Sequence, residues 1–443
     1  MLLFFISNTG EALPLAYRLR KEGTDAKVYI HNRQYRQNYG GVFNKVGMAK
    51  VKQTARKADL VIFDMTRVNE GTKDDKTLLG IFKVAKKSET VFGPVADKIK
   101  THTPVIGASA WTEELEMDRK KGADLARKLG IRTPESKDFK KLSDGAAFLK
   151  GRKDRWVFKP HNNQDLDLTY VEKYPGELFR KLQDEYPKRV GGKVPFMLQR
   201  HVQGAEISTE GWFDGSRFVH FNHTLENKRL MNGNLGPAIG SQSNTVWIKE
   251  KDGLLVKELT GLTPYLKRAG YVGPVDANCI VSEEDHRPYF LEWTPRFGFD
   301  ALFCLLSMVD GPLSDFFLKR FDVPLRAAFA SSERLSVPPF PYSTRGLLDD
   351  FARDVPIQDH LDSQPLFWAQ DVYQDGRDLK CAGADGILGV MASRGNSWGG
   401  SWGNIYRPLE KLRVGSYKQY RTDGAKSLER RYNKLKKWGV SID

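Results

Sequence analysis

The first 110 residues alternate between short apolar runs and amphipathic stretches, a pattern typical of strands followed by helices. Residues 11–22, for example, place Leu13, Ala16 and Leu19 on one helical face. This alternation predicts a parallel sheet covered by helices, with a ligand at the carboxyl ends of its strands. No G-x-G-x-x-G fingerprint follows the first apolar run, so a dinucleotide site is not indicated. The predicted strands are Leu2–Ser7, Lys27–His31, Asp59–Asp64, Thr90–Phe92 and Pro104–Ile106.

A second pattern extends from residue 111 to residue 330. Asp214-Gly215 lies between two apolar runs and predicts a tight hairpin, so the strands here should be antiparallel. Residues 113–129 and 254–269 predict helices, whereas abundant Asn and Gly predict a loop over residues 226–244. We expect an α+β nucleotide clamp with strands at Arg155–Lys159, Leu168–Val171, Phe196–Arg200, Glu206–Phe213, Arg217–Asn222, Val272–Val281 and Pro288–Trp293.

Residues 331–443 form the third predicted part, a small α+β domain. Ser and Pro residues are frequent over 331–343, which is typical of a linker. The last segment, residues 410–443, carries ten Lys and Arg but only four Asp and Glu. One interpretation is a polyanion-binding surface, and the more ordinary one is a solvated helix face. The expected elements are strands at Pro365–Tyr373 and Gly386–Ala392 and helices at 403–413 and 423–438.

Composition and charge narrow the class of protein. The chain has 443 residues, of which 40% are hydrophobic, and this excludes disorder along the whole chain. The net charge of +15 attracts polyanions and anionic small molecules without choosing between them. Three widely spaced cysteines show no zinc pattern and fit a reducing compartment. Since no apolar stretch approaches the about 18 residues of a membrane span, we expect a cytoplasmic protein without a membrane partner.

Three groups of residues could carry chemistry. Lys159 ends an apolar strand, where an ammonium group can contact nucleotide phosphates, although such a lysine is more often an ordinary surface residue. The strand end Gln199–Val202 could pair through its backbone with an adenine edge, and Glu206 could hold ribose hydroxyls. Asp276 and Glu292 lie on successive strands and would repel each other unless a cation such as Mg²⁺ or Mn²⁺ lies between them. The alternative is two solvated acids at strand ends.

These groups follow one another along the chain in the same order as in ATP-grasp enzymes. Two longer motifs indicate which family of these enzymes the chain resembles. Residues 226–240, ENKRLMNGNLGPAIG, are similar to the motif DHKRxxDGDxGPNTGG, and residues 291–298, LEWTPRFG, are similar to LEFNxRFGDPE. Weaker similarity extends through residues 366–376, 386–390 and 417–421. The chain therefore resembles the phosphoribosylamine–glycine ligases of purine biosynthesis, as a divergent member. This resemblance implies an ATP-grasp fold with an N-terminal Rossmann-like domain and a small C-terminal domain.

The resemblance also implies a reaction and a role for each matched residue. ATP would phosphorylate the carboxylate of glycine, and the amine of 5-phosphoribosylamine would attack the acyl phosphate to form an amide. The implied ATP-binding residues are Arg119, Lys159, Gln199, Arg200, His201, Val202 and Glu206. The implied metal ligands are Asp276, Glu292 and Thr294, and the implied catalytic residues are Arg296 and Lys228. The implied substrate-binding residues are Lys228, Arg229, Gly236, Pro237 and Gly240.

The chain departs from the family mainly where the amine is held. Asn8–Ala12 replaces the family's GGREH segment, and Phe63–Arg67 replaces a VGPE-type loop. Thr294 replaces an Asn ligand, and residues 161–167 replace a glycine-rich phosphate lid. Two alternatives therefore stay open. The acceptor could be another phosphorylated nucleotide or a modified DNA base, or the protein could bind nucleotides without catalysis.

Overall fold

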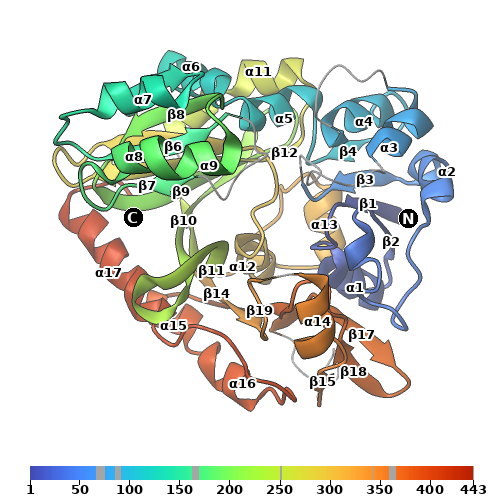
Figure 1. Cartoon of the computed structure of the whole chain (residues 1–443). Coiled ribbons are helices and arrows are strands. Elements are labelled where there is room, and N and C mark those ends of the chain that lie inside the picture. The colour runs from blue at the N-terminus through green and yellow to red at the C-terminus, as the bar shows by residue number, and fades with distance from the viewer. Residues whose placement is uncertain are drawn as a thin grey trace. The chain divides into compact units, whose positions relative to one another are not determined.

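The computed structural model describes residues 1–65, 75–84, 91–161, 169–249, 252–342, 344–358 and 366–442 (Figure 1). These residues group into two compact units. Unit 1 comprises residues 1–113, 207–276 and 294–443, and unit 2 comprises residues 114–206 and 277–293. The three domains expected from the sequence, with boundaries near residues 110 and 330, stay a prediction. None of the helices in the described ranges is long and apolar enough to cross a membrane.

The N-terminal part of unit 1 is built on a parallel four-stranded sheet with the order β2-β1-β3-β4. Its strands are β1 (Leu2–Ser7), β2 (Asp25–Ile30), β3 (Leu60–Phe63) and β4 (Val105–Ile106). Apolar side chains of β1 and β3 pack into one core with those of the helices that follow residue 50, as the sequence pattern predicted. The helices are α1 (Leu13–Lys21), α2 (Val51–Lys57), α3 (Asp75–Phe82) and α4 (Phe92–Ile99), with short turns η1 (Arg33–Tyr35) and η2 (Met48–Lys50).

One predicted strand of this part is wrong. Residues 90–92 were expected to be extended, but Phe92 begins helix α4, and Thr90 lies outside the described residues. The helix follows from the spacing of Phe92, Val95, Ala96 and Ile99, which are all buried. Such a short apolar run has no period of its own, so the helical spacing becomes visible only when residues 92–99 are considered together.

A large antiparallel sheet holds the middle of the chain, with the strand order β13-β12-β9-β10-β11-β14-β19-β16. The predicted hairpin at Asp214-Gly215 is confirmed, because β9 and β10 pair antiparallel on either side of it. The strands are β9 (Gly204–Phe213), β10 (Phe218–Met231), β11 (Leu235–Lys249), β12 (Gly273–Ser282), β13 (Pro288–Thr294), β14 (Phe329–Ser336), β16 (Phe367–Ala369) and β19 (Ile387–Gly395).

The predicted loop over residues 226–244 is wrong, since these residues continue strands β10 and β11. The turn between the strands, η5 (Asn232–Asn234), contains Gly233 at φ 68°, a conformation that favours glycine. The strands were not predicted because many of their side chains are polar, yet Asn227, Gln242 and Asn244 are fully buried. Each bonds to at least one other polar group, and the Asn244 amide, for instance, donates to Ser332 Oγ at 3.2 Å.

The predicted linker over residues 331–343 is also wrong over its first half. Strand β14 lies inside the large sheet, paired with β11 on one side and β19 on the other. Ser331, Ser332 and Glu333 are fully buried there. A Ser-rich sequence has the composition of a linker, but here its hydroxyls bond to neighbouring strands, as between Ser331 and Thr245 at 3.1 Å.

Helices and a small sheet complete unit 1. The small sheet has the order β15-β18-β17, with β15 (Pro356–Ile357), β17 (Val372–Asp375) and β18 (Asp378–Cys381). The C-terminal helix α17 (Gly424–Lys437) packs on β10 and β11. The other helices are α10 (Val256–Thr260), α11 (Thr263–Arg268), α12 (Ala301–Met308), α13 (Leu313–Leu318), α14 (Arg345–Phe351), α15 (Trp398–Trp402) and α16 (Tyr406–Lys411).

Unit 2 is built on a four-stranded sheet with the order β5-β8-β6-β7. Its strands are β5 (Ser136–Phe139), β6 (Trp156–Pro160), β7 (Tyr170–Val171) and β8 (Phe196–Arg200). The single helix expected over residues 113–129 is two helices, because Asp118 caps the second by accepting from the amides of Lys120 and Lys121. The helices of this region are α5 (Ala110–Met117), α6 (Arg119–Lys128), α7 (Leu142–Leu149), α8 (Glu177–Arg180), η4 (Lys181–Glu185) and α9 (Tyr186–Val190).

Candidate active site

Strand alternation in unit 2 places two of the predicted ATP-binding residues on one face of the sheet. In the antiparallel pair β6–β8, Lys159 is opposite Met197 and Val157 is opposite Gln199. Opposite residues of such a pair point to the same face, so Lys159 and Gln199 share one. The other face carries Trp156, Phe158, Phe196 and Leu198, which pack with α7, α8 and α9 into the core of this unit.

The predicted hinge residues border a cavity in unit 2. Arg200, His201 and Val202 line it together with Glu283 and Tyr289, and its volume is about 340 Å³. The Arg200 and His201 amides donate to the carbonyls of Glu135 (2.8 Å) and Arg155 (2.9 Å), so they hold the hinge in place. Burial, helped by the charge of Arg155, lowers the pKa of His201 and favours its neutral imidazole near pH 7. This histidine is therefore suited to hydrogen bonding rather than to carrying charge.

The other predicted residues of unit 2 lie at the ends of elements. Arg119 is the first residue of α6, and Glu206 lies near the start of β9. Both are half-buried, whereas Glu292 on β13 is exposed. The predicted lid, residues 161–167, lies outside the described residues from Asn162 onward.

In unit 1, neighbouring strands bring Asp276 and Lys228 into one acidic group, which we call the Asp276 cluster: Asp276, Glu210, Glu226, Lys228 and Ser208. Burial, then the nearby Glu210, raises the pKa of Asp276, and the Ser208 hydroxyl bonds to its carboxylate. Burial also raises the pKa of Glu210 to about 8. The Lys228 ammonium lies 3.7 Å from Glu226 Oε2 and is the cation of the group. Buried carboxylates this close favour either protonation or an added cation.

The donor set of the Asp276 cluster fits Mg²⁺, which prefers carboxylate oxygens and is usually held by one or two of them together with phosphate oxygens and water. In the described ranges no group of three or more His, Cys, Asp and Glu residues could enclose a metal by itself. A site that depends on phosphate oxygens would not form such a group. Thr294, the predicted third ligand, is half-buried at the end of β13.

The predicted substrate-binding residues Arg229, Gly236, Pro237 and Gly240 belong to the β10–β11 hairpin. The Arg229 guanidinium donates to the Gly236 carbonyl at 2.7 Å, so this arginine helps to fix the hairpin. Its own carbonyl accepts from Arg421 at 3.2 Å. The structure thus gives Arg229 a supporting contact, and its contact with a substrate stays a prediction.

A second acidic group lies where the chain departs from the family, and sequence reasoning did not single it out as a site. We call it the Glu11–Asp64 cluster. Asp64 follows β3, accepts from the Ala12 amide at 3.3 Å and has a pKa raised by burial and then by Glu11. Arg296 lies close enough to Glu11 to oppose the rise in its pKa that burial causes. The side-chain amide of Asn8 is fully buried and has no hydrogen-bond partner among the described residues.

This cluster occupies the position where parallel sheets bind ligands, beyond the carboxyl ends of β1 and β3. It also links the predicted catalytic Arg296 to the N-terminal loops. The available signal in the sequence was an acidic residue directly after an apolar strand, at Asp64. The proximity of Arg296 to Glu11 could not be foreseen, because it depends on how distant segments of unit 1 pack.

Comparison with known proteins finds low sequence similarity to enzymes of purine biosynthesis. No protein-family model matches the chain. The chain is 22% identical over 332 residues to a phosphoribosylamine–glycine ligase of Leptospira interrogans, covering 70% of this chain and 75% of that protein. It is also 22% identical to the human trifunctional purine biosynthetic protein adenosine-3, covering 73% of this chain and 34% of that protein.

Solved structures give a consistent result. The phosphoribosylamine–glycine ligase of Thermotoga maritima superposes with a TM-score of 0.68 at 16% identity, over 96% of this chain and 100% of that chain. The biotin carboxylase of Campylobacter jejuni superposes with a TM-score of 0.59 at 12% identity, over 99% and 97% of the two chains. The N5-carboxyaminoimidazole synthetase of Staphylococcus aureus has a TM-score of 0.53 at 10% identity, over 89% and 94%. The predicted ATP-grasp fold is confirmed.

Proposed function

We propose that the protein is an ATP-dependent ligase that joins a carboxylate to an amine through an acyl phosphate. The similarity of both sequence and fold to phosphoribosylamine–glycine ligases supports this reaction class. The observation that carries the proposal is the Asp276 cluster, where buried and half-buried carboxylates lie beside Lys228 on neighbouring strands. Burying such a group of charges costs free energy, so the group favours a bound cation. Phosphoryl transfer requires a cation of this kind.

The predicted ATP-binding residues and Arg296 then have these parts in the reaction. Lys159 and Arg119 bind the phosphates of ATP, while the hinge from Gln199 to Val202 and Glu206 bind adenosine. A carboxylate oxygen of the substrate attacks the γ-phosphorus, the bond to ADP breaks, and an acyl phosphate forms. Arg296 stabilises the charge of the transferring phosphoryl group.

The amine nitrogen then attacks the acyl carbon, phosphate leaves, and the amine proton passes to phosphate or water. Mg²⁺ or Mn²⁺, when bound, supplies positive charge to the phosphates; Asp276 and Thr294 would hold it, and the resemblance also assigns Glu292. No nucleophilic side chain is needed, because the attacking groups belong to the substrates.

We propose glycine and 5-phosphoribosylamine as the substrates. The support is the retained motif from Lys228 to Gly240 and the similarity to ligases that are named for this pair. The loops after β1 and β3 differ from the motifs of these ligases, so the part of the site that would hold the amine has other side chains. The residues there, in the Glu11–Asp64 cluster, are acids that suit hydroxyl and ammonium donors.

A product assay tests the proposal. Purified protein is mixed with ATP, Mg²⁺, glycine and 5-phosphoribosylamine, and both ADP and the amide product are quantified by mass spectrometry. We expect ADP and amide in equal amounts, each requiring both glycine and the amine. Asp276→Asn should abolish turnover without unfolding the protein, because it keeps the shape of the side chain and removes the carboxylate that would hold the metal ion. Asp252→Asn, at an exposed loop residue, is the matched control.

Three outcomes would count against the proposal in different ways. Full turnover in Asp276→Asn would remove the metal assignment. Glycine-dependent ADP release that ignores 5-phosphoribosylamine would remove this acceptor and leave the ligase chemistry. Binding of ATP without ADP release under any condition would favour a nucleotide-binding protein without catalysis.

A further inference from the structure

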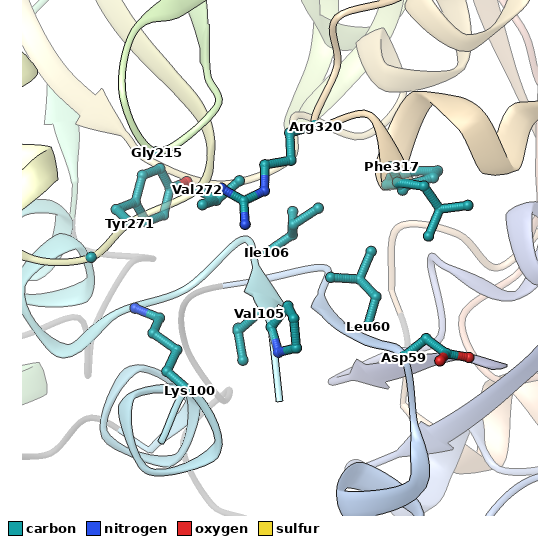
Figure 2. A pocket seen from close by; sticks show the side chains of 13 residues that line it. Asp59, Leu60, Lys100, Val105, Ile106, Gly215, Tyr271, Val272, Phe317 and Arg320 are labelled. Atoms are coloured by element: carbon teal, nitrogen blue, oxygen red, sulfur yellow. The ribbon is translucent and has the colours of Figure 1, made fainter. Parts of the chain in front are cut away.

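Unit 1 contains a pocket at the end of its parallel sheet that lies opposite the Glu11–Asp64 cluster. The pocket is bordered by the amino-terminal ends of β3 and β4, at Asp59–Leu60 and Pro104–Ile106 (Figure 2). The Glu11–Asp64 cluster lies at the other end of the sheet, since Asp64 follows the carboxyl end of β3. The pocket volume is about 420 Å³, within the range of about 300–1,000 Å³ of small-molecule sites.

The walls of the pocket are apolar and its charged groups are mainly cationic. Ile106, Val272 and Phe317 contribute hydrocarbon surface, while Arg320 and Lys100 bring positive charge. Figure 2 shows the Arg320 guanidinium pointing into the pocket above Ile106, with Lys100 entering from another side. The one acid of the lining, Asp59, already accepts from the Leu2 amide at 2.6 Å.

Arg320 has most of its hydrogen-bonding capacity available. Among the described residues its guanidinium donates once, to the Asp214 carbonyl at 3.2 Å, although a guanidinium offers five N–H donors. Lys100 is more occupied, with Asp97 Oδ1 at 3.0 Å and the Ala269 carbonyl at 3.4 Å. Arg320 is therefore the group that an anion in this pocket would contact first.

The backbone at Arg320 gives an independent reason to assign it a role. Its φ is 49°, and that of Phe321 is 74°, so two successive non-glycine residues adopt the left-handed conformation after α13. Helix ends of this kind normally use glycine, because a side chain there is strained. Phe321 is compensated by full burial against Trp212 and Phe316. Arg320 is exposed and has no such packing, which suggests that its side chain is kept for binding.

We propose that this pocket binds a small organic anion with an apolar body, such as an aromatic carboxylate. The anionic group contacts Arg320 and Lys100, and the body packs on Ile106, Val272 and Phe317. The proposal does not depend on the ligase reaction, since none of these residues belongs to the predicted catalytic set.

The probe is 4-bromobenzoate, with neutral 4-bromobenzamide and inorganic phosphate as comparisons. Calorimetry of the full chain should show saturable binding of the benzoate, and binding of both comparison compounds should be at least about tenfold weaker, as expected for the loss of a charged contact or of the apolar body. The bromine anomalous peak of a soaked crystal should lie beside Ile106. Affinity for either comparison compound equal to that for the benzoate, or a bromine peak only elsewhere, would overturn the proposal.

Variants separate binding from folding. Arg320→Gly should leave the melting temperature unchanged or raise it, because glycine relieves the left-handed strain, yet it should weaken benzoate binding about tenfold or more. Lys100→Met removes the second cation at a different element and should also weaken binding. Lys319→Ala, which alters the neighbouring side chain outside the pocket, is the control and should bind normally. Undiminished affinity in Arg320→Gly would refute the assignment.

Discussion

A single buried acid, Glu333, should influence how the stability of unit 1 depends on pH. It lies on β14, fully buried, and accepts from Gln242 Nε2 at 2.8 Å and from the Arg421 amide at 2.9 Å. Burial raises its pKa to about 8 from the ordinary 4.5, although Arg421 opposes the rise. The folded protein therefore keeps a proton that the unfolded chain releases between these two values.

This difference fixes the sign of the pH effect. As the pH rises from 4.5 to about 8, the free energy of unfolding should fall, by at most about 1.4 kcal/mol per pH unit from this residue. Glu333→Gln keeps the accepting oxygen and removes the titration, so its unfolding free energy should be flatter with pH and higher than that of the wild type at pH 8. Urea unfolding at several pH values measures this.

The control is Glu429→Gln, an exposed residue of α17, which should follow the wild-type curve. If Glu333→Gln also follows that curve, Glu333 is ionised in the folded protein. The strands around it would then supply more stabilising contacts to its charge than the geometry indicates.

Lys159 offers a test of nucleotide binding at one side chain. It lies on the face of the unit 2 sheet opposite the apolar core, so truncation should spare the fold. Lys159→Ala should weaken ATP binding by about 1.5–3 kcal/mol, the usual contribution of a hydrogen bond to a charged group. Titration calorimetry with ATP measures this. Lys153→Ala, an exposed lysine just before β6, should bind ATP as the wild type does, and equal loss in both variants would point to general charge rather than to a phosphate contact.

At the scale of elements, helix α17 shows that a basic segment can be partly structural. Leu428 and Leu435 are buried on its inner face. On the same helix, Arg431 donates to the Glu226 carbonyl at 2.7 Å and to Asn227 Oδ1 at 2.8 Å. Part of the positive charge that suggested a polyanion partner therefore holds the helix on β10.

The remaining charge can be tested directly. Changing Lys434, Lys436 and Lys437 to Gln removes the last-turn charges of α17 and leaves Arg431 in place. Turnover with a small acceptor should be unchanged, because these lysines are not in the predicted substrate set. If duplex DNA binds the protein, and the triple variant loses affinity with a shallower salt dependence, the DNA-acceptor alternative is favoured instead. Fluorescence anisotropy over a salt series provides this measurement.

For the molecule as a whole, the sequence predicted mainly those elements that are determined by the spacing of apolar residues. The strands of the parallel sheet and the Asp214-Gly215 hairpin follow from that spacing. Residues 226–244 and β14 could not be recognised, because their buried groups are Asn, Gln and Ser that bond to one another across strands. A hydropathy scale describes the free energy of transferring a side chain from water. It takes no account of a hydrogen-bond partner that a distant strand supplies to a buried polar group.

The residues of the candidate site also fall into those that the sequence could predict and those that only the fold brings together. The pair of acids on successive strands supplied Asp276, and motif resemblance supplied Lys228; the structure brings the two residues into one cluster. Glu210 joins them only through the arrangement of neighbouring strands, and Glu11 meets Arg296 only through the packing of distant segments. Single residues of a motif can be found from sequence, whereas the neighbours that set their charge depend on the completed fold.

The position of β14 has a consequence for synthesis of the chain. Because β14 separates β11 from β19 in the sheet, the edge of β11 has no strand to pair with until residues 329–336 have left the ribosome. A nascent chain with an open strand edge offers its N–H and C=O groups to any extended segment nearby. Translation that stalls before residue 329 should therefore yield a species prone to strand exchange between copies.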